Sequence, residues 1–412
     1  MDTILRSHAD AIVNSAIKAV QPDAAVARAL EGKVFPGRVL LVAAGKAAWQ
    51  MAKAAHDCIG DRIEKGVVVT KYHHVKGPIA NFDCYEAGHP VPDENTFSAT
   101  QKALELVSNL TEQDTVLFLL SGGGSALFEK PLVPGEELRD ITSQLLACGA
   151  DIVEMNTIRK RLSGVKGGRF AEVCAPAKVF AVVLSDILGD PLDMIASGPA
   201  CPDSSTCDQA ITIAKKYDLQ LSDKAWDLLS RETPKTLTNV QTQINGSVRE
   251  LCAAAAKACE ELGYKPILLT DQLSCQAKEA GAFLASILKT HAGEKENLAF
   301  IAGGETVVQL TGKGLGGRNQ EIALSAAAGI ADISGAAVFS VGSDGTDGPT
   351  DAAGGYCDYE TQAALRKKGW DIYETLQNND AYHALQAVDG LIITGPTGTN
   401  VNDVAVALLK GK

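Results

Sequence analysis

The sequence has a deficit of positive charge. Its 412 residues include 38 Lys and Arg against 50 Asp and Glu, which gives a formal net charge of -12. A protein that binds duplex nucleic acid needs a basic surface to neutralise phosphates, so this balance argues against a nucleic-acid partner. If the protein handles an anion, it must do so with positive charge that is concentrated locally.

Long hydrophobic runs and a signal peptide are also lacking. No stretch approaches the ~18 uninterrupted apolar residues that a membrane-spanning helix requires. The first 20 residues alternate apolar and charged side chains at helical spacing, without the apolar block or the cleavage site of a signal peptide. The 10 cysteines form no CxxC pair and no zinc pattern. We therefore expect a cytoplasmic protein with buried, unpaired thiols and no membrane partner.

Short apolar runs alternate with helical patterns along the whole chain. The clearest runs are 39–44, 66–70, 115–120, 178–186, 265–270, 298–304, 336–344 and 390–395. Nearly continuous apolar strands separated by helices are typical of parallel sheets with helices on both faces. A polar stretch without periodicity, 230–243, separates two such blocks. We expect an α/β fold with two Rossmann-like domains, residues 1–235 and 236–412, each built on a mainly parallel sheet.

Most of these runs end in Gly, Ser, Asp or Thr, and open α/β sheets bind ligands beyond the carboxyl ends of their strands. Lys46 follows the first run at the expected start of a helix, where a cation beside helix N–H groups suits an anion. The full phosphate-loop motif is absent, so a solvated lysine explains Lys46 about equally well. The segment SGGGSAL follows the run at 115–120. Its glycines allow a close backbone approach and predict a phosphate-binding loop of Ser121, Gly122, Gly123, Gly124 and Ser125.

A cluster of positive charge lies between residues 159 and 169. Arg159, Lys160, Arg161, Lys166 and Arg169 occur within eleven residues, with no acidic residue between them. In a chain of net charge -12, this local excess favours an electropositive mouth for an anionic substrate. For any single Arg or Lys of the cluster, an ordinary surface role is the better explanation.

Acidic residues lie at the ends of several predicted strands. Asp186 ends the run at 178–186, Asp344 and Asp347 lie on the glycine-rich turn that ends the run at 336–344, and Glu305 lies at the start of a predicted strand. Carboxylates without a nearby Cys or His set are the oxygen ligands that Mg²⁺ prefers, often shared with phosphate oxygens. We predict that these four residues bind Mg²⁺ or Mn²⁺, with Asp186 as the first candidate for metal or substrate.

A second glycine-rich loop precedes an expected helix in the C-terminal block. Gly312, Gly314 and Gly317 satisfy G-x-G-x-x-G, which permits a nicotinamide cofactor, although the acidic residue expected about 20 positions later is unclear. The alternative is that Arg318, at the start of the helix, faces a phosphoryl group. The chain then closes with a predicted strand at 390–395, a loop, and a predicted helix that begins near Asn400.

These features together match the requirements of phosphoryl transfer, namely a metal between phosphate oxygens, cations for the developing charge and an oriented hydroxyl. The motifs also closely resemble those of the class II glycerate kinases, a family whose tartrate-pathway members were long labelled hydroxypyruvate reductases. The resemblance runs in order through AAGKAA, GHPVPDENT (88–96), SGGGSAL, MNTIRKRLSGVKGGR, LSDILGDPLDMIASGP, GGETVVQLTGKGLGGRNQE, GSDGTDGPTDAAGG and GPTGTNVND.

The resemblance implies a two-domain α/β fold with its active site in the interdomain cleft, and a family-characteristic C-terminal domain at about 296–406. It implies Mg-ATP-dependent phosphorylation of D-glycerate, most often at the 2-hydroxyl. Lys46 and Arg318 match the family's proposed catalytic pair. We accordingly expect ATP or phosphate to bind at residues 121–125, Gly314 and Gly316, and the substrate to bind at Arg159, Lys166 and Asn319.

Three points stay open at this stage. The family does not fix the proton acceptor, for which Asp186 is preferred over Asp344. An NAD(P)H-dependent hydroxypyruvate reductase is the alternative activity, although no convincing His–carboxylate pair is present to protonate a carbonyl. A sugar-acid binding module is a third interpretation, but it leaves the glycine-rich strand ends unexplained. A homodimer is left open as the assembly.

Overall fold

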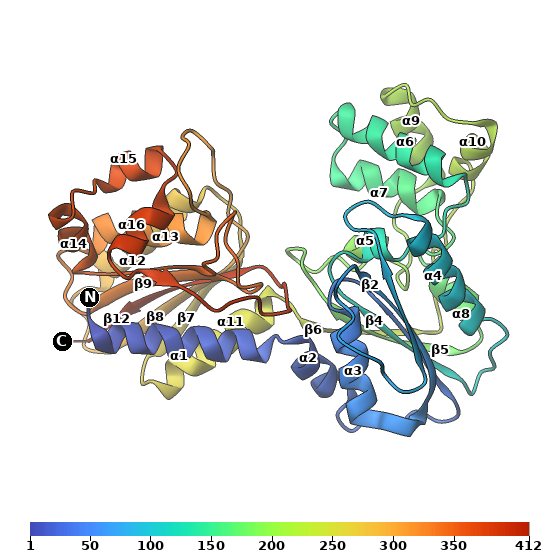
Figure 1. Cartoon of the computed structure of the whole chain (residues 1–412), viewed down its shortest axis with the longest axis horizontal. Helices are drawn as coiled ribbons and strands as arrows, with labels where there is room; N and C mark the ends of the chain where they lie inside the picture. The colour runs from blue at the N-terminus through green and yellow to red at the C-terminus, as the bar shows by residue number, and fades with distance from the viewer. Residues whose placement is uncertain (412) are drawn as a thin grey trace. The chain divides into compact units, whose positions relative to one another are not determined.

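The computed structural model describes residues 1–411 and divides into two compact units (Figure 1). The N-terminal unit comprises residues 22–245, and the C-terminal unit comprises residues 1–21 together with the chain from 246 onward. This division differs from the expected boundary at 235/236 in two ways: the first helix, α1 (Thr3–Ala19), clusters with the C-terminal unit, and residues 236–245 belong to the N-terminal unit. The buried face of α1 packs against α11 (Val248–Glu261), which gives those apolar side chains their core.

The sheet of the N-terminal unit has six strands. In spatial order they are β3 (Phe82–Ala87), β2 (Ile63–Lys71), β1 (Val39–Ala44), β4 (Thr115–Leu120), β5 (Lys178–Leu184) and β6 (Val240–Gly246). The pairs from β3 to β5 are parallel, as the apolar runs predicted. Side chains alternate between its faces, so Leu40 and Val42 of β1 join one core cluster, whereas Val39 and Leu41 join another.

Helices cover both faces of this sheet. α2 (Pro22–Leu30) and α3 (Ala48–Ile59) pack on one face, and α4 (Glu94–Leu106), α5 (Gly124–Leu127) and α8 (Arg169–Cys174) pack on the other. A separate helical cluster with its own apolar core comprises α6 (Gly135–Ala147), α7 (Ile152–Arg161), α9 (Cys207–Lys216) and α10 (Asp223–Leu229) (Figure 1). Two short 3-10 turns, Gly60–Arg62 and Ile195–Ser197, complete the unit.

The C-terminal unit also has a six-stranded sheet. Its spatial order is β11 (Leu391–Ile392), β10 (Gly354–Asp358), β9 (Ala336–Gly342), β12 (Asp403–Leu409), β8 (Leu298–Gly304) and β7 (Lys265–Leu273). β7 and β8 are parallel, whereas β12 is antiparallel to both β8 and β9. The predicted α/β class is therefore confirmed for both units, with a mixed sheet in the second one.

The prediction of a helix that begins near Asn400 is wrong. Residues 403–409 form β12, a fully buried strand between β8 and β9. After Asp403, residues 404–409 form a continuous apolar run of six residues, which fits a central strand covered on both faces better than an amphipathic surface helix. Its antiparallel pairing with β8 and β9, together with that of β10 with β9 and β11, makes the second sheet mixed and not mainly parallel as expected.

The helices of the C-terminal unit lie on both faces of its sheet (Figure 1). α1 and α11 pack on one face, and the other core cluster contains residues from α12 (Ala277–His291), α13 (Arg318–Ile330), α14 (Thr361–Lys367), α15 (Ile372–Gln377) and α16 (Ala381–Ala387). None of the helices between residues 1 and 411 is long and apolar enough to cross a membrane.

Candidate active site

Polar residues follow three neighbouring parallel strands of the N-terminal unit and lie at the same edge of its sheet. Lys46 follows β1, the segment 121–125 follows β4, and Asp186 follows β5. β4 lies between β1 and β5, with Leu120 paired to Ala44 on one side and to Val183 on the other. Because carboxyl ends of neighbouring parallel strands lie at the same edge, these three segments lie together at one edge of the sheet.

Backbone and side-chain hydrogen bonds fix Lys46 against the glycine loop. The Lys46 backbone N donates to the Gly122 carbonyl oxygen at 2.9 Å, and the Ala47 N donates to Ser121 Oγ at 3.0 Å. Gly45, at φ +126°, precedes the lysine, and a Cβ there would lie 2.3 Å from Ser121 Oγ. The loop after β4 and the start of α3 are therefore packed backbone to backbone, with the half-buried Lys46 side chain beside the loop.

Each glycine of the loop is in close contact with a different neighbour. A Cβ on Gly122 would lie 2.2 Å from Asp186 Oδ2, and one on Gly124 would lie 2.7 Å from the Ala196 Cβ. Gly123 has φ +84°, and a Cβ there would lie 3.0 Å from the imidazole of His89 and 3.1 Å from Lys46 Cγ. The three consecutive glycines therefore let a carboxylate, an imidazole, a lysine and a strained turn approach one short piece of backbone.

His89 is a site residue that the sequence analysis did not assign. It follows β3, and its half-buried ring lies against Gly123 and Lys46. Burial lowers the pKa of His89, and the nearby positive charges of Lys46 and Lys71 lower it further. The only sequence signal was its position in the motif GHPVPDENT, which carried the resemblance without giving its histidine a role.

A buried network supports the end of the glycine loop. Ser125 Oγ and Ser197 Oγ are 3.2 Å apart, and Ser197 Oγ donates to Asn156 Oδ1 at 2.8 Å. Ala196 and Ser197 have φ values of +50° and +62°, which non-glycine residues rarely adopt. Strain of this kind persists only where the surrounding structure imposes it, and it is common at functional sites.

Arg159 is the member of the basic cluster that reaches the glycine loop. Its Nη2 donates to the Ser125 carbonyl oxygen at 3.1 Å. Its Nε is buried and has no hydrogen-bond partner among the described residues. A buried guanidinium N–H without a partner is costly, so this group is well suited to a ligand oxygen.

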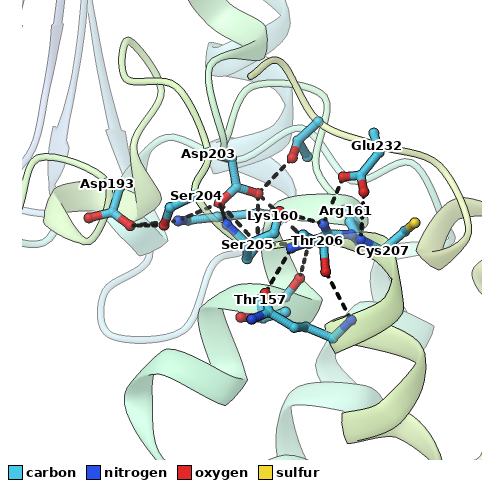
Figure 2. Close-up of polar contacts among 12 residues, drawn as sticks. Thr157, Lys160, Arg161, Asp193, Asp203, Ser204, Ser205, Thr206, Cys207 and Glu232 are labelled. Atoms are coloured by element: carbon cyan, nitrogen blue, oxygen red, sulfur yellow. Dashed lines mark hydrogen bonds and ion pairs between the residues drawn. The ribbon is translucent and has the colours of Figure 1, made fainter. Parts of the chain in front are cut away.

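Most of the basic cluster is internal and paired, so the expectation of an electropositive mouth is wrong for Lys160 and Arg161. Figure 2 shows both side chains meeting Asp203, with Lys160 Nζ 3.0 Å from Oδ1 and Arg161 Nη1 3.7 Å from Oδ2. Arg161 also pairs with Glu232 at 3.3 Å, and its side chain is fully buried. The carboxylates that pair with Lys160 and Arg161 lie more than 30 residues downstream, where local sequence could not pair them.

Lys166 is likewise held inside the unit. Its Nζ lies 2.7 Å from Glu129 Oε2 and donates to the Phe128 carbonyl oxygen at 3.0 Å, and both ion-pair side chains are fully buried. Burial lowers the pKa of Lys166 to about 8, against the opposing effect of Glu129. The structure thus places Lys166 in a fully buried ion pair.

Arg318 is the central cation of the C-terminal unit. It begins α13, and its Nε and Nη2 bind Asp403 Oδ2 and Oδ1 at 2.5 and 3.0 Å. Its Nη1 binds Glu305 Oε1 at 2.9 Å. Burial lowers the pKa of Arg318, but the bonds to Asp403 outweigh burial and raise it overall. The guanidinium is therefore permanently charged and fixed in orientation, and its side chain stays one-third exposed.

Asp347 caps α13 instead of pointing outward to a metal. Its two carboxylate oxygens accept the backbone N–H groups of Asn319 and Gln320 at 3.2 and 2.9 Å. Burial raises the pKa of Asp347 to about 6, against the lowering effect of these two bonds. A Cβ on Gly317 would lie 2.3 Å from this carboxyl carbon, which explains the glycine before Arg318. The Asn319 side chain is also buried, with its Oδ1 bound to Ser340.

The second glycine loop packs against the chain and does not present its N–H groups to a ligand. Gly312 N donates to Asn379 Oδ1 at 2.9 Å, and Gly314 N donates to the Asn378 carbonyl oxygen at 2.8 Å. A Cβ on either glycine would lie 2.3–2.4 Å from residues 378–380. Close packing against residues 378–380 therefore accounts for the glycines at 312 and 314, and no cofactor pyrophosphate is needed to explain them. The main support for a nicotinamide-binding site is thereby removed. Gly316 packs beside Ala381.

The four predicted metal ligands are not brought together as a set. Asp347 caps a helix and Glu305 binds Arg318, whereas Asp344 lies half-buried after β9, where it accepts the Thr346 N–H. Among residues 1–411, no group of three or more His, Cys, Asp or Glu is placed to hold a metal ion. Mg²⁺ is often bound through one or two carboxylates with substrate phosphates and water. Asp186, which adjoins the Gly122 backbone, fits that mode.

Two family profiles match the chain. Residues 8–230 match the domain of unknown function DUF4147, and residues 298–403 match the MOFRL family. Among full-length relatives, D-glycerate 2-kinase of Thermotoga maritima is 54% identical and glycerate 2-kinase of Pyrococcus horikoshii is 39% identical. The first alignment covers 98% of both chains, and the second covers 97% of this chain and 96% of the relative.

Two further comparisons concern the alternative activity and the fold. A putative hydroxypyruvate reductase of Agrobacterium vitis is 38% identical over 90% of this chain and 100% of its own length. The crystal structure of glycerate kinase from Thermotoga maritima matches with a TM-score of 0.94 and 53% identity. That match covers 98% of this chain and 99% of the other, so the α/β architecture of both units is shared.

Proposed function

Because the chain belongs to the glycerate 2-kinase family, we propose that it transfers the γ-phosphoryl group of ATP to the 2-hydroxyl group of D-glycerate. The observation that carries this proposal is the glycine loop at 122–124, whose three glycines adjoin Asp186, His89 with Lys46, and Ala196. A loop of glycines between Lys46 and the Asp186 carboxylate lets phosphate approach the backbone closely and places charge beside it, as phosphoryl transfer requires. Gly312 and Gly314, by contrast, are occupied by protein contacts, which leaves the reductase alternative without a site.

Lys46 and Arg318 supply positive charge to the transferring group. Lys46 is held by its backbone to Gly122, so its ammonium group acts beside the phosphate loop. Arg318 uses Nε, Nη1 and Nη2 to bind Asp403 and Glu305, and a guanidinium has five N–H donors, so two N–H groups remain for phosphate oxygens. Charge fixed before the reaction stabilises the equatorial oxygens of the transition state without reorganisation.

Arg159 is the proposed partner of the glycerate carboxylate. It is anchored through Ser125, and its buried Nε lacks a hydrogen-bond partner among the described residues. Guanidinium N–H groups bind carboxylates with charge-assisted hydrogen bonds. Lys166 and Asn319 are not carried forward as substrate contacts, because buried protein partners already occupy them.

Asp186 is the residue proposed to hold Mg²⁺ with ATP. The metal, when bound, shields the negative charge of the phosphates. The Asp186 carboxylate adjoins the Gly122 backbone, so a cation that it binds stays beside the phosphate loop. A cytoplasmic location and a homodimer stay predictions, and light scattering during size-exclusion chromatography tests the second.

The activity test compares three incubations of the purified chain. D-Glycerate with Mg²⁺ and ATP is expected to yield ADP, and added enolase is expected to raise the absorbance of phosphoenolpyruvate, because 2-phosphoglycerate is its direct substrate. D-Glycerate without ATP is the blank. Hydroxypyruvate with NADH or NADPH is expected to show no nicotinamide oxidation. Nicotinamide oxidation without ADP formation would overturn the proposal.

Lys46→Met tests the site itself, with Lys53→Met as its control. Lys53 lies on α3, the helix that follows Lys46; its side chain is 42% exposed and pairs with Asp57 one turn further along that helix. We expect Lys46→Met to lower kcat by at least about 100-fold, the scale of losing one preorganised charge, while Lys53→Met stays near wild type. An unchanged kcat in Lys46→Met would remove Lys46 from the catalytic set.

A further inference from the structure

His89 occupies the same edge of the sheet as the phosphate loop. β3 pairs with β2 in parallel, and β2 pairs with β1, so the residues after β3 reach the edge at which Lys46 lies. A Cβ on Gly123 would lie 3.0 Å from both Nε2 and Cδ2 of His89. The ring therefore covers the middle glycine of the loop, with its Nε2 side toward that backbone.

The surroundings of His89 keep its imidazole neutral. Burial is the largest influence and lowers its pKa, and the positive charges of Lys46, Lys71 and His74 act in the same direction. The neighbouring carboxylate of Asp93 is occupied, since it accepts the Tyr72 hydroxyl at 2.6 Å and caps α4 through the Thr96 N–H. A neutral imidazole has one ring nitrogen with a free lone pair, which accepts a hydrogen bond or a proton.

Few groups at the site can accept a proton. Lys46 and the Arg159 guanidinium are donors, and the Ser125 hydroxyl is a poor base. His89 and Asp186 are the acceptors that adjoin the glycine loop. A carboxylate that binds Mg²⁺ loses basicity, because the cation stabilises its ionised form. With Asp186 engaged by the metal, the imidazole is the better proton acceptor.

We propose that His89 accepts the proton of the glycerate hydroxyl during phosphoryl transfer, an inference that rests on the proposed function. The hydroxyl oxygen forms a bond to the γ-phosphorus as the bond from that phosphorus to the bridging oxygen breaks. The electron pair of the broken bond leaves with ADP. The hydroxyl proton moves to the free ring nitrogen of His89, which then releases it to water. His89 thus replaces Asp186 and Asp344 as the candidate general base.

The test is His89→Gln, with His73→Asn as the control. Glutamine keeps a hydrogen-bonding group at position 89 but cannot take a proton near neutral pH, whereas His73 is an exposed histidine of the neighbouring loop. General-base catalysis contributes about 10²–10⁴-fold. We expect His89→Gln to lower kcat by at least 100-fold, with the KM for ATP changed less than about threefold. His73→Asn should match wild type.

The pH profile separates proton transfer from a structural role. In wild type, kcat should fall at acid pH, below the range in which an ordinary histidine becomes protonated, as His89 takes up its proton, and this acid limb should be absent in His89→Gln. An NMR titration of the ring should give a lowered pKa for His89, and Lys46→Met should raise that pKa. A residual kcat that keeps the acid limb, or a loss confined to the KM for ATP, would overturn the role of His89. If wild type forms no phosphoglycerate, the proposed function fails instead.

Discussion

Arg318 and Asp403 form a bidentate ion pair across the C-terminal sheet. Two guanidinium nitrogens bind the two carboxylate oxygens at 2.5 and 3.0 Å, although the residues are 85 positions apart in the chain. Asp403 is the first residue of β12, which lies between β8 and β9, so its carboxylate reaches the start of α13. The pair fixes the plane of the guanidinium, and Glu305 holds the remaining terminal nitrogen.

Asp403→Asn should lower activity more than it unfolds the protein. The amide keeps one oxygen to accept from Arg318 but loses the charge, so the guanidinium is free to turn toward Glu305. We expect kcat to fall about tenfold, and the free energy of unfolding to fall by about 1–3 kcal/mol, the usual range for a buried charged hydrogen bond. Turnover and urea unfolding measure the two effects.

Asp332→Asn is the control for that variant, because Asp332 is an exposed acid of the same unit. It should change neither kcat nor the urea midpoint. If Asp403→Asn keeps the wild-type kcat while losing stability, the ion pair is structural and Arg318 does not depend on it for catalysis.

Gly123→Ala should disable the phosphate loop. The position needs φ +84°, and a Cβ would press on His89 and Lys46 at 3.0–3.1 Å. Gly263→Ala is a matched control, because Gly263 has φ +81° but nothing lies within 4 Å of its Cβ position. Both variants carry the backbone strain of about 1–2 kcal/mol. We expect the two variants to lose similar thermal stability. Only Gly123→Ala should lose activity, by more than about tenfold.

The grouping of polar residues at the strand ends of the N-terminal unit was predictable from the sequence. It depends only on where each apolar run ends and on the strands being parallel. Each apolar run ends where its strand ends, and parallel neighbours bring Lys46, the glycine loop and Asp186 to one edge without further knowledge. The glycine pattern also predicted a close backbone approach at 122–124. It could not show which groups approach, since His89 and Ala196 come from distant loops.

The features that the sequence did not predict depend on contacts between residues that are far apart in the chain. The charges at 160 and 161 indicated an open basic surface, but Asp203 and Glu232 pair with them inside the fold. Likewise, G-x-G-x-x-G at 312–317 matched a cofactor pattern, whereas the glycines accommodate the backbone of residues 378–380. The direction of β12 was equally hidden, because a buried run of apolar residues does not reveal which strands it will lie between.

Lys166→Met should destabilise the protein without weakening glycerate binding. The substitution leaves the Glu129 carboxylate buried without its cation, which typically costs about 3–5 kcal/mol. Adding Glu129→Gln should recover part of that loss, because the uncompensated charge is removed. The KM for glycerate, measured well below the midpoint of unfolding, should stay within about twofold of wild type. Lys102→Met, at an exposed helix pair, is the control. A tenfold higher KM at wild-type stability would restore Lys166 as a substrate contact.

Asp347→Asn should change how stability depends on pH. Burial raises the pKa of Asp347 from 3.8 in the unfolded chain to about 6 in the folded protein. The folded state therefore binds more protons between these values, so wild type loses stability as pH rises from 4 to above 6. A shift of about two units corresponds to roughly 3 kcal/mol. Asparagine keeps one carbonyl oxygen, which can accept the N–H of Asn319 or that of Gln320 but not both, and it does not titrate. The advantage of wild type over Asp347→Asn in urea unfolding should thus be largest near pH 4 and smallest above pH 6. A constant difference across this range would show that the Asp347 carboxyl titrates with its ordinary pKa.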